Sequence, residues 1–333
     1  MTNKTNESAS RGGAELSRDN AARFQIPSPR AALWQIANTF VPYFLLWFAM
    51  VRAFSVSYWL VVPLAVLAAG FLTRMFIIFH DCGHASFFRS RRANNLTGVV
   101  AGLLNLTPYR HWRWQHALHH GTAGDLDRRG TGDMWTLTVQ EYRASSWRVR
   151  AAYRLVRNPI VLFLVAPLYT FIVHHRFSSA GAPARERYSV WKTNAALLGV
   201  TVLMSMTIGF KAFVSIQLTV SAFAGALGLW LFYVQHQFEG AYWVRSSEWN
   251  FDAAALEGSS FYKLPKILQW FTGNIGFHHI HHLNPRIPNY KLERCHEADP
   301  YCRSIKPLTL ISSLRSLTFR LWDERRRAYV GYR

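Results

Sequence analysis

Long apolar stretches alternate with polar, arginine-rich stretches along most of the chain. Four apolar stretches are long enough to cross a bilayer as helices, and they lie at about residues 33–51, 57–79, 193–210 and 213–235. They form two closely spaced pairs, so the pattern predicts two transmembrane hairpins. We therefore expect an all-α integral membrane protein with four transmembrane helices.

Two further apolar stretches are not expected to cross the membrane. Residues 96–106 are too few for a hydrocarbon core of about 30 Å, which favours a re-entrant or interfacial helix. Residues 159–173 are ambiguous, and a crossing there would leave the histidine clusters described below on opposite sides of the membrane. Because one site cannot lie on both sides, we expect residues 159–173 to lie along the membrane or to re-enter it.

The charges predict which side of the membrane the polar segments face. Residues 81–157 contain twelve arginines and no lysine, and residues 240–333 contain fourteen lysines and arginines together. The two short outer turns contain only Arg52 and Lys211. The positive-inside rule therefore places both termini and the histidine clusters in the cytoplasm. This asymmetry accounts for the net charge of +20, and no nucleic-acid-binding motif accompanies it, so we expect no nucleic-acid partner.

The remaining composition divides the chain into three segments. Residues 1–32 are polar and rich in Ser, Asn and Arg, and we expect them to be disordered. Residues 33–310 make up the expected membrane domain, and residues 311–333 a basic C-terminal tail. The three cysteines have neither a disulfide pattern nor a zinc-ribbon spacing, and no signal peptide is evident, which indicates reduced thiols in the cytosol.

Eight of the fourteen histidines fall in three clusters with helical spacing. His80 and His84 stand at positions i and i+4. The other two clusters both have the spacing i, i+3, i+4, which places three imidazoles on one helix face. Their members are His116, His119 and His120, and His278, His281 and His282. A low-complexity histidine run would explain one such cluster, but not three of them far apart in the chain.

The three clusters indicate a site for two metal ions. Imidazole binds zinc, copper, iron and nickel, and eight ligands exceed the three or four that one zinc ion uses. The chain lacks the full Glu-x-x-His set of soluble di-iron proteins and the His-Glu-x-x-His pattern of metalloproteases. Lipid tails are within reach of a dimetal site beside a membrane, and breaking their C–H bonds requires a redox metal and O2.

The clusters resemble the histidine boxes of membrane fatty acid desaturases. The boxes read HDCGH from residue 80, HALHH from residue 116 and HHIHH from residue 278. The flanking segments GHASFF, GDLDRRG, FYVQHQFE and NPRIPNY begin at residues 83, 124, 232 and 284, and they are similar to those of bacterial acyl-lipid desaturases of the Δ12/ω6 type. The resemblance covers about residues 30–310.

This resemblance implies a fold, a location and a set of metal ligands. It implies four spans in a bacterial inner membrane, a cytosolic helical cap, and two iron ions held by histidines that use O2 as co-substrate. His236 directly follows the fourth predicted span and matches the place of a further ligand in the family; otherwise it would only be a polar end to that helix. The nine expected ligands are therefore His80, His84, His116, His119, His120, His236, His278, His281 and His282.

Other residues are expected to support these ligands or to have no part in the site. A metal-binding imidazole usually donates its other N–H to a carboxylate or a carbonyl. Candidates for this role, each of which could equally be a cap, a surface charge or a salt-bridge partner, are Asp81, Asp125, Asp127, Asp133, Glu239 and Asn274. The histidines expected not to bind metal are His111, His174, His175, His279 and His296.

The expected activity is the oxygen-dependent introduction of a cis double bond into the acyl chain of a membrane lipid or a fatty acyl thioester. The alternatives are a hydroxylase, an epoxygenase or a carotenoid oxygenase with the same boxes, and a membrane protein that only binds metal. No fused cytochrome b5 or ferredoxin domain is evident, and three cysteines are too few for an iron–sulfur cluster. We therefore expect an external electron donor, ferredoxin or a similar acidic carrier, attracted by the basic cytosolic face.

Overall fold

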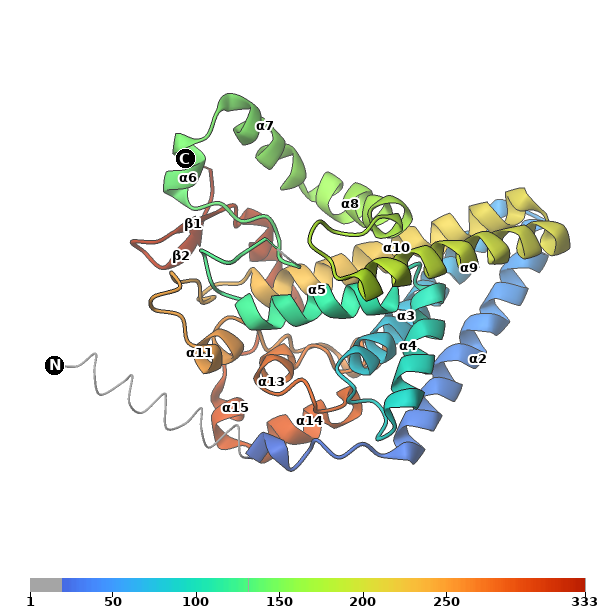
Figure 1. Ribbon diagram of the computed structural model, residues 1–333, viewed down its shortest axis with the longest axis horizontal. Helices are drawn as coiled ribbons and strands as arrows, with labels where there is room; N and C mark the ends of the chain where they lie inside the picture. Colours follow the sequence, from blue (N-terminus) through green and yellow to red (C-terminus); the bar gives the residue numbers. More distant parts are fainter. Residues whose placement is uncertain (1–19, 131, 333) are drawn as a thin grey trace.

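The computed structural model describes residues 20–130 and 132–332. The chain is mostly helical, and its four longest helices are α2 (Pro29–Phe54), α3 (Tyr58–Gly83), α9 (Ala184–Ile208) and α10 (Phe210–His236). They form two hairpins whose tips lie together at one end of the molecule (Figure 1). The shorter elements gather toward the other end. Each long helix contains one of the four apolar stretches predicted as spans.

Helix α3 lies at the centre of the helical packing. Ser28 and Ser57 cap the starts of α2 and α3, since each side chain accepts a hydrogen bond from a backbone N–H in the first turn. The second half of α3 is buried almost throughout, because α2, α10 and α4 (Arg91–Leu104) all pack against it. The histidines at the end of α3 are therefore held in rigid, packed surroundings.

Arg74 is the single charged residue in the apolar part of α3, and it is satisfied inside the protein. Its side chain is 7% exposed. The guanidinium donates hydrogen bonds to Thr39 Oγ1 and to the carbonyl of Trp270, and it lies 4.0 Å from the centre of the Trp270 ring. These contacts stabilise a charge that would be costly in a membrane helix without a partner.

Three of the long helices are long and apolar enough to cross a membrane, and these are α2, α3 and α10. Helix α9 is not among them, because its first turns contain Arg185, Glu186 and Lys192 and its apolar part starts only afterwards. Leu198 and Met206 in that apolar part are 67% and 81% exposed, which is typical of a surface in contact with lipid. The arrangement of four spans therefore remains a prediction.

The segment around residues 159–173 is helical with irregular, partly π-helical turns. It consists of η1 (Val161–Val165), α8 (Ala166–Leu168), η2 (Tyr169–Val173) and η3 (His174–Arg176), and it follows α7 (Trp147–Val156) after a bend of 65°. Pro167 packs against Gly225, roughly three turns before the end of α10. His175 then lies 3.2 Å from Thr107, just before α5 (Tyr109–Thr122). The segment thus runs along α10 away from the histidine boxes and then returns toward them. Such a path favours a re-entrant segment.

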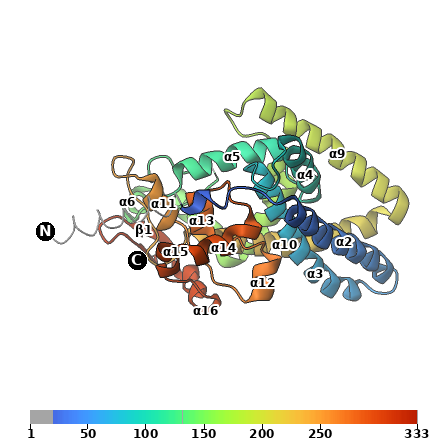
Figure 2. The same ribbon diagram turned by 90° about the horizontal axis from the view of Figure 1, so that it is seen from below.

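The remaining elements cover the ends of α3 and α10. Helix α13 (His278–Leu283) lies between α5 and α14 (Asn289–Ala298) in both views (Figure 2). Phe277, Ile280 and Leu283 pack into an apolar cluster together with residues of α11 (Phe251–Leu256) and α14. This cluster holds α13 in place while His278, His281 and His282 face the other way. The outer elements are α6 (Val139–Ala144), α12 (Lys266–Phe271), α15 (Pro300–Ser304), α16 (Leu310–Ser313) and η4 (Leu314–Thr318).

The two ends of the described chain have more structure than the sequence predicts. Strands β1 (Leu321–Asp323) and β2 (Ala328–Val330) form an antiparallel hairpin with Trp322 buried opposite Tyr329, so residues 311–333 are more than a basic tail. Strands of three residues are too short to show a period-two pattern, which is why an all-α fold was expected. Residues 20–32 are also ordered, and Asn20 donates a hydrogen bond to Asp299. The disorder predicted for residues 1–19 lies outside the described residues.

Cysteine labelling of intact cells tests the predicted topology. The native cysteines Cys82, Cys295 and Cys302 are all buried, so reporters at other positions give the signal. Cysteines placed at residues 55 and 211, in or next to the turns of the two hairpins, should react with an impermeant maleimide from outside. Cysteines at residues 130, 180 and 320 should react only after the membrane is opened. Labelling of residue 180 from outside would mean that the segment before it spans the membrane and that the four-span prediction is wrong.

Candidate metal centre

The nine histidines predicted as ligands come together from four helices. His80 lies in the last turn of α3 and His84 directly after it, while His236 ends α10. Helix α5 contributes three histidines from one face, and α13 contributes the remaining three. Because α3 and α10 both end here, the site lies where the long helices meet the smaller elements.

The start of α13 depends on tight turns. Gly273 and Asn274 have φ values of 53° and 59°, in the left-handed region that glycine and asparagine tolerate best. A Cβ on Gly276 would lie 2.3 Å from the carbonyl oxygen of Tyr262, so only glycine fits this approach. These turns explain the Gly-Asn-Ile-Gly sequence before the third box, which aims α13 at the site.

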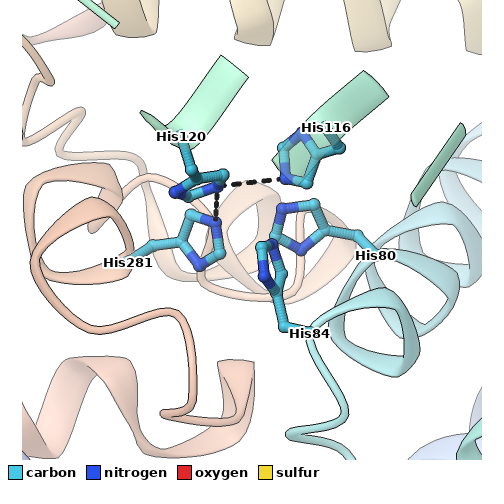
Figure 3. A group of neighbouring side chains, drawn as sticks. All are labelled: His80, His84, His116, His120 and His281. Atoms are coloured by element: carbon cyan, nitrogen blue, oxygen red, sulfur yellow. Dashed lines mark hydrogen bonds between the residues drawn. The ribbon is translucent and has the colours of Figure 1, made fainter. Parts of the chain in front are cut away.

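One group of histidines contains members from all three boxes, namely His80, His84, His116, His120 and His281. Each offers a ring nitrogen, and these nitrogens all lie within 4.8 Å of one another. The Nε2 atom of His120 lies 3.1 Å from that of His116 and 3.0 Å from that of His281 (Figure 3). Five imidazoles around one small volume form a suitable set of ligands for a metal ion.

A second group lies beside the first and contains His119, His236 and His282, whose ring nitrogens also lie within 4.8 Å of one another. His278 adjoins this group, because its Nε2 atom is 3.1 Å from the Nε2 atom of His236. Its ring also lies 4.5 Å from that of His282, centre to centre. The nine imidazoles thus form two neighbouring groups, as a dinuclear centre requires.

Three of the histidines turn their Nδ1 atoms away from the groups toward oxygen atoms. Nδ1 of His119 lies 2.8 Å from Asp133 Oδ1, and Nδ1 of His80 lies 3.3 Å from Asp81 Oδ1. His236 places its Nδ1 atom 3.1 Å from the carbonyl oxygen of Gly258. An N–H donated from Nδ1 leaves the Nε2 lone pair free to face the group, which is the tautomer that a metal ligand needs.

Burial favours the neutral form of six of the site histidines. The pKa of His84 lies well below 6.5, first because burial disfavours the charged form and second because other cationic side chains are near. Burial also lowers the pKa values of five further histidines well below 6.5, with neighbouring imidazoles as the second cause: His116, His120, His278, His281 and His282. Neutral imidazoles keep the lone pair that binds a metal.

A bound metal ion would provide a partner for the unpaired ring nitrogens of the site histidines. Nε2 of His84 and Nε2 of His282 are buried without a hydrogen-bond partner among the described residues. A buried polar atom without a partner is costly, and a bound cation in each group would remove that cost. The residues present therefore fit two metal ions held by nitrogen.

Four of the six candidate supporting residues have partners other than the site histidines. Asp125 accepts hydrogen bonds from Arg128 and Ser246, and Asp127 accepts hydrogen bonds from Arg245 and Ser246. Glu239 pairs with Arg315 at the surface, and the Asn274 side chain bonds Gln269 and the backbone of Asn289. These contacts agree with the alternative roles that the sequence left open for these four residues, as surface charges, salt-bridge partners or parts of local turns. Asp81 and Asp133 do contact histidines.

The structure adds two supporting residues that the sequence reasoning did not single out. Asn289 donates hydrogen bonds from its backbone N–H and its side chain to Asp81 Oδ2, and its own Oδ1 accepts one from Gln35. Trp112 stacks on His116, with ring centres 4.4 Å apart and an angle of 18° between the planes. The NPRIPNY segment contains Asn289, so that motif was a usable signal. Trp112 is one turn before His116, which the helical spacing could have shown.

The five histidines expected not to bind metal lie outside both groups. His279 faces away and contacts His296, with a nitrogen–nitrogen distance of 3.4 Å. His111 accepts a hydrogen bond from the backbone of Ser179, and His175 lies beside Thr107. These side chains have local partners in the fold.

An apolar cavity of about 660 Å³ reaches the two groups between α3, α5, α10 and the irregular helical segment of residues 161–176. One histidine from each box lines it, and these are His80, His116 and His278. Its deeper part lies among Leu72, Phe76 and the glycine-rich face of α10 around Gly228, at the level of the long helices. A long, apolar ligand would therefore have its middle beside the imidazoles.

Apolar helices of membrane-spanning length and a buried cluster of histidines beside an apolar cavity define a membrane-associated metalloenzyme class. Comparison with known proteins agrees with this class. The family model for fatty acid desaturases matches residues 57–308. The chain belongs to the fatty acid desaturase family, and it is an enzyme that desaturates fatty acids. The resemblance predicted from the boxes is confirmed.

Individual relatives show how far the similarity extends. The chain is 48% identical to a fatty acid desaturase of Bacillus subtilis (strain 168) over 312 residues, which cover 94% of this chain and 89% of that protein. It is 29% identical to an sn-1 acyl-lipid omega-3 desaturase (ferredoxin) of Synechocystis, over 75% of this chain and 68% of the relative. An sn-1 oleoyl-lipid 12-desaturase of Synechocystis is 28% identical over 72% of this chain and 68% of its own length.

Alanine substitutions of His236 and His279, which lie outside the i, i+3, i+4 pattern, test the assignment of ligands. His236→Ala should reduce the metal content of the purified enzyme and abolish product formation, because it removes a nitrogen from the second group. His279→Ala, its matched control, should keep both, since His279 faces His296 instead. Metal content is measured by plasma mass spectrometry. Full metal and activity in His236→Ala, or loss of both in a well-folded His279→Ala protein, would contradict the assignment.

The hydrogen bond from His119 to Asp133 can be tested separately. Asp133→Asn removes the charge that orients the imidazole, and loss of such a partner typically weakens metal binding by about 10–100-fold. Asp127→Asn is the control, because Asp127 contacts only Arg245 and Ser246 through its side chain among the described residues. Competition with a chelator measures the metal affinity. Equal affinities in the two variants would show that Asp133 does not support the metal ligand.

Proposed function

We propose that the protein introduces a cis double bond into the acyl chain of a membrane lipid, using two iron ions bound by the nine histidines and O2 as co-substrate. The observation that carries this proposal is the apolar cavity with one histidine from each box in its wall. The cavity accounts for an apolar, elongated substrate, and the imidazoles account for the metal. A fatty acyl thioester would fit the same cavity, and the lipid-acting relatives favour the lipid.

The chemistry requires a redox metal, which supports iron over zinc in an all-imidazole site. When two iron ions are bound, they supply the oxidising power that removes two hydrogen atoms from adjacent carbons, with consumption of O2 and two electrons. The protein contributes the arrangement of the ligands. Asp133 and Asp81 lie against the Nδ1 atoms of His119 and His80, which would leave their Nε2 atoms free to hold a metal ion.

The cavity would position the acyl chain and exclude water from the reacting carbons. Phe76 and Leu72 lie in its wall below His80 on α3, and Trp112 closes it beside His116. The rings of Phe76 and Trp112 meet edge to face at 5.6 Å, which fixes the wall next to the imidazoles. An acyl chain held against these side chains would present a defined pair of carbons to the metal site. Water would be excluded from the site.

The predicted topology supports a cytoplasmic active site in a bacterial inner membrane. Both predicted hairpins start and end on the arginine-rich side, and the histidines lie at that end of α3 and α10. Electrons would then come from a soluble carrier in the cytoplasm. A ferredoxin is the carrier we propose, because one relative is described as ferredoxin-dependent.

Expression in a bacterial host that lacks polyunsaturated lipids tests the proposed reaction. Gas chromatography with mass spectrometry of the total fatty acids should show a new olefin whose double bond has the cis configuration, and its formation should stop without O2. Hydroxylated or epoxidised chains in place of the olefin would contradict the proposal and favour another oxygenase. Bound metal without any oxidised lipid would favour a protein that only stores metal.

The cavity predicts a substitution that changes chain-length preference. Gly228 lines the cavity, and a Cβ added there meets no atom within 4 Å, so Gly228→Leu can fill the space without displacing the backbone. Turnover of the natural chain should fall about tenfold or more, because one misplaced contact near the reacting carbons commonly costs that much. Chains a few carbons shorter should be affected less.

Gly199→Leu is the matched control for this substitution. Gly199 also lies in a long helix, α9, and also has open space around an added Cβ, but it does not line the cavity. The product profile of each variant is measured with mixed acyl lipids. If both variants keep the wild-type profile, the acyl chain does not occupy this cavity.

A further inference from the structure

A second cavity reaches the histidine groups from another side, and its lining is strongly basic. It has a volume of about 850 Å³, and its charged lining residues are Arg89, Arg91, Arg113, Arg185 and Arg286, beside His84. Among the residues that the structure describes, none that lines it is acidic. We call it the arginine cavity.

The five arginines come from separate parts of the fold. Arg89 and Arg91 lie at the start of α4, and Arg113 lies on α5. Arg185 lies in the first turn of α9, and Arg286 follows α13. Four segments far apart in the sequence thus place their positive charges around one opening.

These charges have no partner ions in the described part of the chain. All five side chains are exposed, and none of them forms a salt bridge with a described residue. Elsewhere on the surface, Arg128, Arg129 and Arg245 are each paired with a carboxylate. An unpaired set of like charges around a concave surface creates a positive potential that attracts an acidic partner.

The arginine cavity and the apolar cavity share no lining residue. The apolar cavity touches His80, His116 and His278, whereas the arginine cavity touches His84. His84 therefore links the first histidine group to the arginine cavity, because it belongs to that group, its Nε2 atom is buried, and the residue also lines the basic opening. The acyl chain and the ligand of the arginine cavity would approach the centre separately.

We propose that the arginine cavity is the docking site for an acidic one-electron carrier protein, and that electrons enter the centre through His84. This inference rests on the proposed function, because that function requires two electrons for each double bond. The balanced reaction converts –CH2–CH2–, O2, two electrons and two protons into –CH=CH– and two molecules of water. Two reduced carriers are oxidised in turn, and the protons come from water on the cytoplasmic side.

Anionic lipid headgroups are negatively charged like an acidic carrier, so they are the alternative ligand of the arginine cavity. They would explain arginines near the membrane surface, but they would not explain an opening that leads to one of the site histidines. A docked carrier requires that opening, because its redox centre must come close to a ligand of the metal. The observations therefore favour the carrier, and the lipid becomes an outcome of the test.

The experiment uses the full-length enzyme in phosphatidylcholine nanodiscs, with a plant-type [2Fe–2S] ferredoxin as the probe. The double variant Arg89→Glu/Arg286→Glu reverses two charges of the arginine cavity. The matched control, Arg150→Glu/Arg303→Glu, reverses two exposed arginines on α7 and α15 that do not line it. Both variants change the net charge equally, so they separate local docking from the overall charge of the protein.

Biolayer interferometry should show that the dissociation constant for oxidised ferredoxin rises about tenfold or more in the cavity variant, mainly through slower association, and at most twofold in the control. The salt dependence of association should also become weaker in the cavity variant. Metal content and a single turnover started by chemical reduction should stay at the wild-type level in both variants.

The possible failures are distinguishable. If chemically reduced wild-type enzyme makes no olefin, the proposed function is wrong. If olefin forms but both variants bind ferredoxin equally well, the docking site is wrong. If the cavity variant keeps its affinity for ferredoxin and instead loses phosphatidylglycerol retained during purification, the arginine cavity binds lipid and the inference is overturned.

Discussion

The structure depends on bringing nine imidazoles into one small volume. Charged imidazoles could not share this space, because burial and mutual repulsion both oppose protonation, and the pKa values of the buried members lie accordingly low. Neutral imidazoles in turn leave lone pairs that only a cation or a donor hydrogen satisfies. The ends of α3 and α10 and one face each of α5 and α13 must therefore meet at a fixed distance. The apolar cluster behind α13 and the tight turn at Gly276 maintain that distance.

The same arrangement would give the acyl chain and the reducing equivalents separate routes to the histidine groups. The apolar cavity follows α3 and α10 toward the level of the long helices, where an acyl chain would be, while the arginine cavity opens among the polar segments. A chain in the first cavity would block water from the imidazoles in its wall. Reducing equivalents would then need a different approach, and His84 is the histidine that lines the second cavity.

Helices with a periodic pattern of residues could be predicted from the sequence. Contacts between residues far apart in the chain could not. The spacing of His116, His119 and His120 was enough to place them on one helix face, and the apolar stretches located the long helices, although α9 begins at Ala184, nine residues before the predicted span. The partners of Asp125 and Asp127 could not be predicted, because nearby arginines and Ser246 compete for these carboxylates and the sequence does not show which lies nearer. Asn289 contacts Asp81 across 208 positions of the chain, and such pairs have no local signal. The β1–β2 hairpin was missed because its strands contain only three residues each.

Mössbauer spectroscopy of the purified enzyme loaded with iron-57 tests the central claim most directly, because the two histidine groups should hold one iron ion each. We expect two iron ions per chain and two quadrupole doublets of equal area, since the two groups differ in their ligands. One iron ion per chain, or a protein that is fully active with zinc in place of iron, would show that the two groups do not form a di-iron centre.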